Sequence, residues 1–296
     1  MWGEISTGRR PWRERRGIGR RRPSRSGSEQ WPPSDRGPPR MDDRIRRLNE
    51  ERFARTAEAF AKSAAVGNLA EIESLVRLAA PAPADLLLDV ACGAGRLLKT
   101  FAPLVGMAVG ADATMEMLRQ ARRAGPGGAA RFFLVRADGS RLPFPDETFT
   151  LVATTLAIHH FGDPRQVLGE MARVCRPGGK IAVGDIVGAS DEAKRARQNE
   201  IERLRDPAHV AVYSPGALEA LLTSCGFAVI GRAGGKQVRE FGEWCRVAAT
   251  PPDVASLVRE RLLQTIAGDE AGMQPTLVGD ELRFHHHWLN LVAVRR

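Results

Sequence analysis

The chain has 296 residues, of which 43% are hydrophobic and 27% charged, a balance typical of a globular protein. No run of 18 apolar residues occurs, so the sequence predicts no membrane-spanning helix. The four cysteines, Cys92, Cys175, Cys225 and Cys245, form no C-x-x-C pair. This spacing argues against a zinc ribbon or a disulfide scaffold and favours a reducing compartment, the cytoplasm.

The positive charge is concentrated near the start of the chain. Residues 1–40 hold eleven arginines and four acidic residues, a net charge of +7 out of +9 for the whole chain. They show no apolar period, which predicts a disordered tail over residues 1–41, or a true start at Met41. A nucleic-acid-binding arm is the functional alternative. No apolar segment follows the arginines, so a signal peptide is not expected.

Two amphipathic helices are predicted directly after this tail. Apolar residues recur at helical spacing over residues 45–60, and the pattern continues to about residue 65. Asn68 followed by Glu71 resembles a capping box that begins a second helix, which Pro81 ends. We expect these helices, residues 44–79, to form a lid over a binding site.

Short apolar runs then alternate with helical stretches. Helices are predicted to begin at Pro164 and Pro215, each after a capping residue. Two inserts, residues 189–212 and 233–282, interrupt the alternation and should help to cap the site. The predicted strands span residues 86–91, 107–111, 132–135, 149–154, 180–186, 227–231 and 283–294.

Fully apolar strands separated by helices indicate a parallel sheet that is covered on both faces. The predicted fold is therefore a Rossmann-like, doubly wound α/β domain over residues 42–296. Its sheet should be mostly parallel and seven-stranded, with the last strand antiparallel and helices on both faces.

Acidic residues and a glycine turn mark the ends of the first three strands. Asp89 precedes the turn at Gly93 and Gly95, Asp112 follows 23 residues after Asp89, and Asp138 ends the third strand. Ligands of open α/β sheets bind beyond the carboxyl ends of the strands. An acid at this offset from the glycine turn is typical of a residue that accepts the ribose hydroxyls.

The pattern does not suit a dinucleotide. Leu98 stands where the fingerprint G-x-G-x-x-G needs its third glycine, and Asp89 would repel a pyrophosphate. A ligand with a ribose and a cationic end but no phosphates, such as S-adenosylmethionine, fits better.

The ordered motifs resemble those of class I S-adenosylmethionine-dependent methyltransferases, and most closely the type-11, UbiE-like small-molecule group. The strong motifs fall within residues 86–186, and a weaker similarity extends over residues 44–296. The residues that carry the resemblance are 87–95, 109–112, 137–139, 142–144, 158–161 and 173–179.

The resemblance implies the following cofactor contacts. Asp89, Ala91, Gly93 and Gly95 would line the methionine and sulfonium side, and Asp112 would hold the ribose hydroxyls. The remaining implied contacts are Ala113 and Met117 beside the adenosine, Asp138 at the adenine amino group with Ala137 and Gly139 adjacent, and Thr155 and Leu156 near the methyl group.

Two departures from the group concern the fourth strand. The chain has Phe149-Thr150 where the group often has Phe-Asp. Residues 155–160 replace an Arg-Asn element of the quinone-methylating members, which argues against a quinone acceptor.

Methyl transfer is an in-line displacement, so a general base is needed only where the acceptor must lose a proton. The candidates for a base are His159, His160, His209 and Tyr213, and His160 has the alternative of bonding to the backbone. No base at all is the other alternative.

Two further groups of residues have alternative interpretations. His285-His286-His287 suggests a metal site, but strand neighbours point to opposite faces, so we expect partly exposed histidines and no metal. Trp244 and Phe241 would either wall an aromatic acceptor pocket or pack in a core.

The sequence thus predicts a cytoplasmic enzyme, a monomer or homodimer, that methylates a small, hydrophobic or aromatic molecule and releases S-adenosylhomocysteine. One alternative is an RNA methyltransferase guided by the basic tail, although Thr154-Thr155-Leu156 is not the Asn/Asp-Pro-Pro-Tyr/Phe element used on base amines. The second alternative is a protein that binds S-adenosylmethionine but catalyses no reaction. We expect a small-molecule partner rather than nucleic acid.

Overall fold

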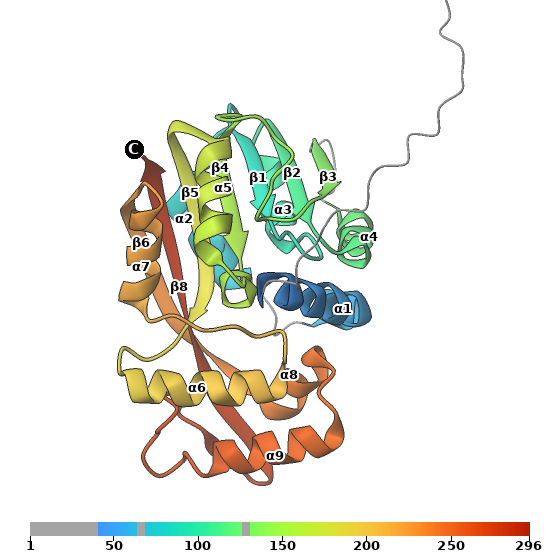
Figure 1. The fold of residues 1–296 in the computed structure, drawn as a ribbon, viewed down its shortest axis with the longest axis vertical. Coiled ribbons are helices and arrows are strands. Elements are labelled where there is room, and N and C mark those ends of the chain that lie inside the picture. The colour runs from blue at the N-terminus through green and yellow to red at the C-terminus, as the bar shows by residue number, and fades with distance from the viewer. Residues whose placement is uncertain (1–40, 64–68, 126–130) are drawn as a thin grey trace, which may run out of the picture. The chain divides into compact units, whose positions relative to one another are not determined.

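The fold is a single open sheet with helices on both faces (Figure 1). The computed structural model describes residues 41–63, 69–125 and 131–296, all within one compact unit. The predicted tail up to residue 40 and the predicted cap at Asn68 lie outside these described residues.

The sheet confirms the predicted architecture. Its strand order is β3-β2-β1-β4-β5-β8-β6, and β8 alone on this path runs antiparallel to its neighbours. A short eighth strand, β7, pairs with β8 off this path. The strands are β1 (Leu86–Val90), β2 (Met107–Asp112), β3 (Phe132–Arg136), β4 (Phe149–Thr155), β5 (Cys175–Val187), β6 (Phe227–Glu240), β7 (Thr276–Val278) and β8 (Glu281–Arg295).

Two helices, α5 and α7, begin where local capping chemistry predicts. Asp163 accepts hydrogen bonds from the first N–H groups of α5, and Ser214 does so for α7, each followed by proline. The helices are α1 (Met41–Lys62), α2 (Leu69–Ala79), α3 (Arg96–Phe101), α4 (Met115–Ala124), α5 (Pro164–Val174), α6 (Glu192–Arg205), α7 (Pro215–Ser224), α8 (Phe241–Ala248) and α9 (Pro252–Leu263), with short 3-10 helices at Ala102–Leu104 and Ile158–His160.

The core has two layers, one on each face of the sheet. Leu88 and Val90 of β1 pack on one face against α5 and α7, whereas Leu87 packs on the other face against α2 and α3. Successive strand residues point to opposite faces, so a continuously apolar strand supplies both layers.

Strands β6 and β8 extend well beyond the main sheet. Their pairing continues to Glu240 opposite Arg283, and the extension carries α6, α8 and α9 around a separate core that includes Trp244 and Phe284 (Figure 1). Residues 233–240, expected to open an insert, are therefore strand. The apolar-run pattern missed them because this glycine-containing, polar stretch is largely exposed.

A buried ion pair joins α1 to the turn that follows α6. Arg52 Nη2 lies 3.0 Å from Asp206 Oδ2, and both side chains are almost fully buried. Asp206 also lies 3.8 Å from the Arg205 guanidinium and accepts the Ala208 N–H at 3.0 Å. One carboxylate thus serves two buried cations.

We predict that Asp206→Ala lowers the free energy of unfolding by about 3–5 kcal/mol, because it leaves Arg52 with no counterion in a buried setting. Urea unfolding of the full chain measures the change. The control is Asp146→Ala, which removes a largely exposed partner of Arg173 and should change stability little. Equal effects of the two variants would contradict the assignment.

Candidate functional site

A large cleft lies beyond the carboxyl ends of β1 to β4, where α1 covers it. We call it the main cleft; it encloses about 1430 Å³ of empty volume that includes open solvent. Helix α1 contributes Arg46, Asn49, Glu50, Phe53 and Phe60 to its lining. The carboxyl ends of parallel strands meet at one edge of the sheet, so the predicted strand-end residues converge here.

Most of the residues implied for cofactor binding do line the main cleft. Asp89 and Gly95 are absent from its lining. The residues that line it are Ala91, Gly93, Asp112, Ala113, Met117, Ala137, Asp138, Gly139, Thr155 and Leu156.

Asp112 anchors the glycine turn. Its Oδ2 accepts the Gly93 N–H and its Oδ1 accepts the Thr114 N–H, each at 2.8 Å. Burial raises the pKa of this carboxyl, and the two backbone donors oppose that effect. Each carboxylate oxygen keeps a second lone pair, so Asp112 retains the capacity to accept hydroxyl groups of a ligand.

Gly95 and Asp89 act behind the cleft wall rather than in it. Gly95 has φ +79°, and a Cβ there would lie 3.0 Å from the Ala121 Cβ of α4, so glycine permits close helix packing. The Asp89 carboxyl is 1% exposed and has no hydrogen-bond partner among the described residues. Burial, with the neighbouring Asp112, raises its pKa well above the ordinary value. Neither of these two residues, which the resemblance implies as cofactor contacts, is part of the lining of the main cleft.

Asp138 ties the end of β3 to the covering helix. Its Oδ1 accepts both the backbone N–H and the hydroxyl of Ser140, at 2.9 and 2.8 Å. Its Oδ2 lies 3.6 Å from Arg46 Nη1 on α1. The carboxylate is thus oriented at the cleft while remaining about one-third exposed.

Two non-glycine residues in the cleft wall have a left-handed backbone. Ala91 has φ 55° and Leu156 has φ 52°, after β1 and β4 respectively. This conformation costs roughly 1–2 kcal/mol for a residue with a Cβ, and such outliers persist where the surrounding structure enforces them. The backbone at the ends of these two central strands is therefore held in place by its environment.

A second cavity adjoins the main cleft on the side of the β6–β8 extension. Its empty volume is about 590 Å³, which includes open solvent, and it shares Phe60, Leu156 and His160 with the main cleft. Its other lining residues are Arg52, His159, Ile186, Arg205, Arg239, Glu240, Glu243, Trp244, Val247 and His286. The shared residues place its mouth at the end of β4.

His159 and Asp185 connect the two cavities. His159 Nδ1 lies 2.6 Å from Asp185 Oδ1, and the same carboxylate accepts the backbone N–H groups of His159 and Ile186 at 3.2 and 2.7 Å. Asp185 lines the main cleft, whereas His159 lines the second cavity. The carboxylate is a fixed acceptor, so it assigns the proton to Nδ1 in the neutral imidazole and leaves Nε2 as the acceptor.

The other three candidates for a base, His160, His209 and Tyr213, differ in their access to the two cavities. His160 lines both cavities, but its Nδ1 bonds to the Ala208 carbonyl at 3.0 Å and burial lowers its pKa well below the ordinary value. His209 lines neither cavity: it is buried, 3.0 Å from Asn199 Oδ1, and burial lowers its pKa to about 3. Tyr213 lines neither, and burial raises its pKa.

Sequence reasoning missed several residues of the main cleft. The helical period of α1 predicted which of its faces is buried. It did not predict that Arg46 and Glu50 lie near Asp138 and Arg136 at the end of β3. Asp185 had a usable signal, because it is an acid near the end of β5, like the three acids on the preceding strands. Asn290 and Trp288 enter through the antiparallel pairing of β8 with β5.

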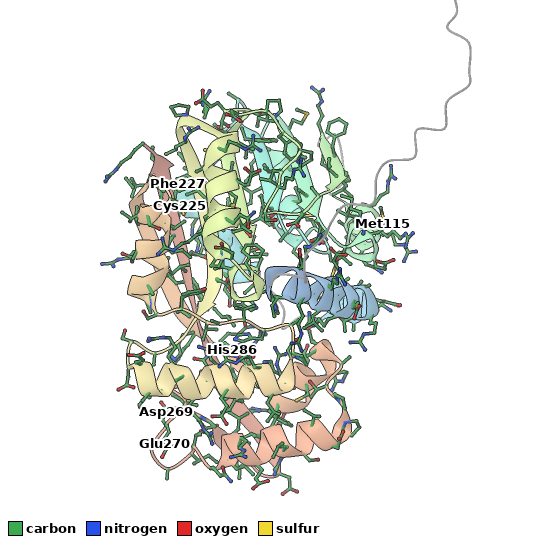
Figure 2. All side chains as sticks on the ribbon, in the orientation of Figure 1. Met115, Cys225, Phe227, Asp269, Glu270 and His286 are labelled. Carbon is green, nitrogen blue, oxygen red and sulfur yellow. The ribbon has the colours of Figure 1, made fainter. Side chains whose placement is uncertain are left out.

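The three strand histidines differ from expectation at one position. His286 is 4% exposed rather than partly exposed, and its Nε2 lies 2.9 Å from Glu202 Oε1 of α6. Figure 2 shows His286 beside α6. Within the described ranges, no three His, Cys, Asp or Glu side chains gather as a metal site. Trp244 lines the second cavity, whereas Phe241 packs against the core of the extension.

None of the helices that the structure describes has the length and apolar character needed to cross a membrane.

Comparisons with known proteins agree on a family. Residues 88–183 match the methyltransferase domain. The chain is 28% identical over 206 residues to the uncharacterized methyltransferase YcgJ of Bacillus subtilis, covering 69% of this chain and 81% of that relative. A demethylmenaquinone methyltransferase of Corynebacterium urealyticum is 38% identical over 104 residues, which are 35% of this chain and 43% of the relative.

A solved structure extends the similarity. The YcgJ protein of Bacillus subtilis has a TM-score of 0.71 and 26% identity, covering 77% of this chain and 98% of that one. The matched domain at residues 88–183 holds most strand ends of the main cleft. The segments β6, α8 and β8, which line the second cavity, lie beyond it.

We predict that Asp112→Ala weakens binding of S-adenosylmethionine by about 1.5–3 kcal/mol, because charge-assisted hydrogen bonds to the ligand hydroxyls are lost. Calorimetric titration measures the affinity. Glu73→Ala, on the exposed side of α2, is the matched control. Unchanged affinity in Asp112→Ala would show that the carboxylate does not contact the cofactor.

Glu71 gives a pH-dependent prediction. Burial raises its pKa to about 7 from an ordinary 4.5, and Arg239 acts in the opposite direction. The folded chain keeps this proton to higher pH than the unfolded chain, so the free energy of unfolding falls from about pH 4.5 to 7 and stays low above. Glu71→Gln should remove that fall, measured as the difference from wild type in urea unfolding at pH 5 and pH 8. A Glu73→Gln control should follow wild type.

Proposed function

Because the chain belongs to the class I S-adenosylmethionine-dependent methyltransferases, we propose that it transfers a methyl group to a hydroxyl group of a small molecule bound in the second cavity. The main cleft would then hold the cofactor, and the end of β4, shared by both cavities, would be the place of transfer. The observation that supports this proposal most directly is the contact between His159 and Asp185.

The residues of the main cleft fit this cofactor. Asp112 offers carboxylate oxygens to ribose hydroxyls, and Asp138 is oriented at the adjoining strand end. Gly93, with φ +52°, leaves room for close approach of a ligand to the turn. When bound, S-adenosylmethionine supplies an electrophilic methyl group.

His159 is the residue best placed to act as a general base. Its Nδ1–H donates to Asp185, which leaves Nε2 unprotonated to take the proton of an acceptor hydroxyl. The Asp185 carboxylate, buried at 3% exposure, would stabilise the imidazolium that forms and hold the ring in orientation. Asp185 is thus a positioning residue, and His160 lacks such a carboxylate.

The walls of the second cavity support a small acceptor with aromatic or apolar surface. Phe60 and Trp244 contribute ring faces, and Leu156 and Val247 contribute apolar surface. Helix α1 covers both cavities through Phe60, so we infer that it acts as the lid that excludes water during transfer.

We predict that His159→Ala lowers kcat by about 10²–10⁴-fold without changing S-adenosylmethionine affinity, because general-base catalysis is lost. Transfer of labelled methyl from the cofactor to a panel of phenols and alcohols, with release of S-adenosylhomocysteine, supplies the rate. Asp185→Asn should lower kcat and also shift the pH–rate profile, which a purely structural residue would not do. The control is His287→Gln. Retained turnover in His159→Ala would contradict the proposal.

A further inference from the structure

The second cavity is lined by three arginines, and one of them has no ion-pair partner among the described residues. Arg52, Arg205 and Arg239 reach it from α1, α6 and β6. Two of them are matched: Arg52 by Asp206 at 3.0 Å, and Arg205 by Glu202 at 3.2 Å. Arg239 is 9% exposed, and no carboxylate of the described residues lies within 4.0 Å of its guanidinium.

Arg239 is held by one edge of its guanidinium. Its Nε donates to His286 Nδ1 at 3.3 Å, and His286 Nε2 in turn lies 2.9 Å from Glu202. Within the described part of the chain, neither Nη atom of Arg239 has a hydrogen-bond partner. The contact with His286 therefore fixes the side chain and leaves its two terminal nitrogens for another acceptor.

Arg52 adds positive charge beside the same cavity, but its unpaired donors are closed off from it. Its Nε and Nη1 are buried and have no hydrogen-bond acceptor among the described residues. Burial lowers its pKa to about 10, and burial also lowers the pKa of Arg239. Both shifts reflect cations that have lost water without full compensation from the protein.

The other carboxylates near the cavity attract Arg239 only from a distance: Glu71, Glu202 and Glu243 favour its charged form, but none of them forms an ion pair with it. Glu243 accepts the Ser63 hydroxyl at 2.8 Å, and Glu240 is about half exposed, 3.7 Å from Arg283. Glu71 attracts Arg239 from the main cleft but forms no ion pair with it within 4.0 Å. Terminal arginine nitrogens without acceptors can hold a carboxylate or a phosphate through two parallel hydrogen bonds.

We propose that the second cavity binds the methyl acceptor by an oxyanion group, a carboxylate or a phosphate, held by the Nη atoms of Arg239 with Arg52 beside it. The acceptor would then be a small hydroxylated acid rather than a neutral molecule. This inference rests on the proposed function in one respect, namely that the second cavity is the acceptor site.

Binding of matched probes to the full chain loaded with S-adenosylhomocysteine tests the inference. The probes are 4-hydroxybenzoate and phenyl phosphate, with 4-hydroxybenzamide as the neutral analogue. Calorimetry should show that both oxyanions, or the one that the site prefers, bind at least tenfold more tightly than the amide. Equal affinity for the amide and the oxyanions would overturn the inference.

Variants of Arg239 make the test specific. Arg239→Gln should lower oxyanion affinity about tenfold to hundredfold and leave the affinities for the amide and for S-adenosylhomocysteine unchanged. Arg239→Lys keeps the charge but loses the planar guanidinium, so its oxyanion affinity should lie between those of wild type and Arg239→Gln. The control is Arg246→Gln on the exposed side of α8. Unchanged oxyanion affinity in Arg239→Gln would overturn the inference.

The thermal stability of Arg239→Gln in the absence of any probe shows whether Arg239 has a binding role or a structural one. A buried cation without a counterion does not stabilise the fold, so Arg239→Gln should unfold at the same or a higher temperature than wild type, and oxyanions should no longer raise that temperature. A large loss of thermal stability would instead show that groups of the protein itself stabilise the Arg239 cation in the folded state. Oxyanion binding without methyl transfer would contradict the proposed function alone, whereas methyl transfer without oxyanion binding would contradict this inference alone.

Discussion

The position of α1 depends on a buried ion pair, and both cavities depend on α1. The helix buries little apolar surface against the sheet domain: Ala57 is the one α1 residue fully buried in the small cluster with Ala94 and Met117. The contact of Arg52 with Asp206 instead ties it to the turn after α6, where the low dielectric makes the attraction strong and its loss costly. The more exposed contact of Arg46 with Asp138 and the hydrogen bond from Asn49 to the His160 carbonyl hold the helix at further points.

The site combines two environments that meet at the end of β4. On the side of the main cleft, the carboxylates of Asp112 and Asp185 are oriented by backbone N–H groups. On the side of the second cavity, guanidinium groups and aromatic rings predominate. His159 belongs to the second side, and its ring is oriented by Asp185 on the first. Desolvation strengthens each of these charged contacts relative to water.

Particular residues show how far sequence reasoning reached. The offset between Asp89 and Asp112 drew attention to Asp112, which lines the main cleft, because strand ends are local features that a sequence can show. The sequence did not show that the carboxyl of Asp89, which precedes the glycine turn, is buried behind the cleft wall. Among the candidates for a base, chain position did not separate His159 from His160, since they are neighbours. Only the hydrogen-bond partners, Asp185 for one and a carbonyl for the other, distinguish them.

By itself the sequence determined the alternation of apolar strands and helices, the capped starts of α5 and α7, and the edge of the sheet at which polar residues converge. These features follow from periodicity and turn chemistry within a few residues. The tertiary structure alone decided that β6 runs on to pair with β8 through residues 233–240, and that Arg52, Arg205 and Arg239 meet in one cavity. Local periodicity tells which face of an element is buried, but not which distant element buries it, so contacts between residues far apart in the chain are settled by packing.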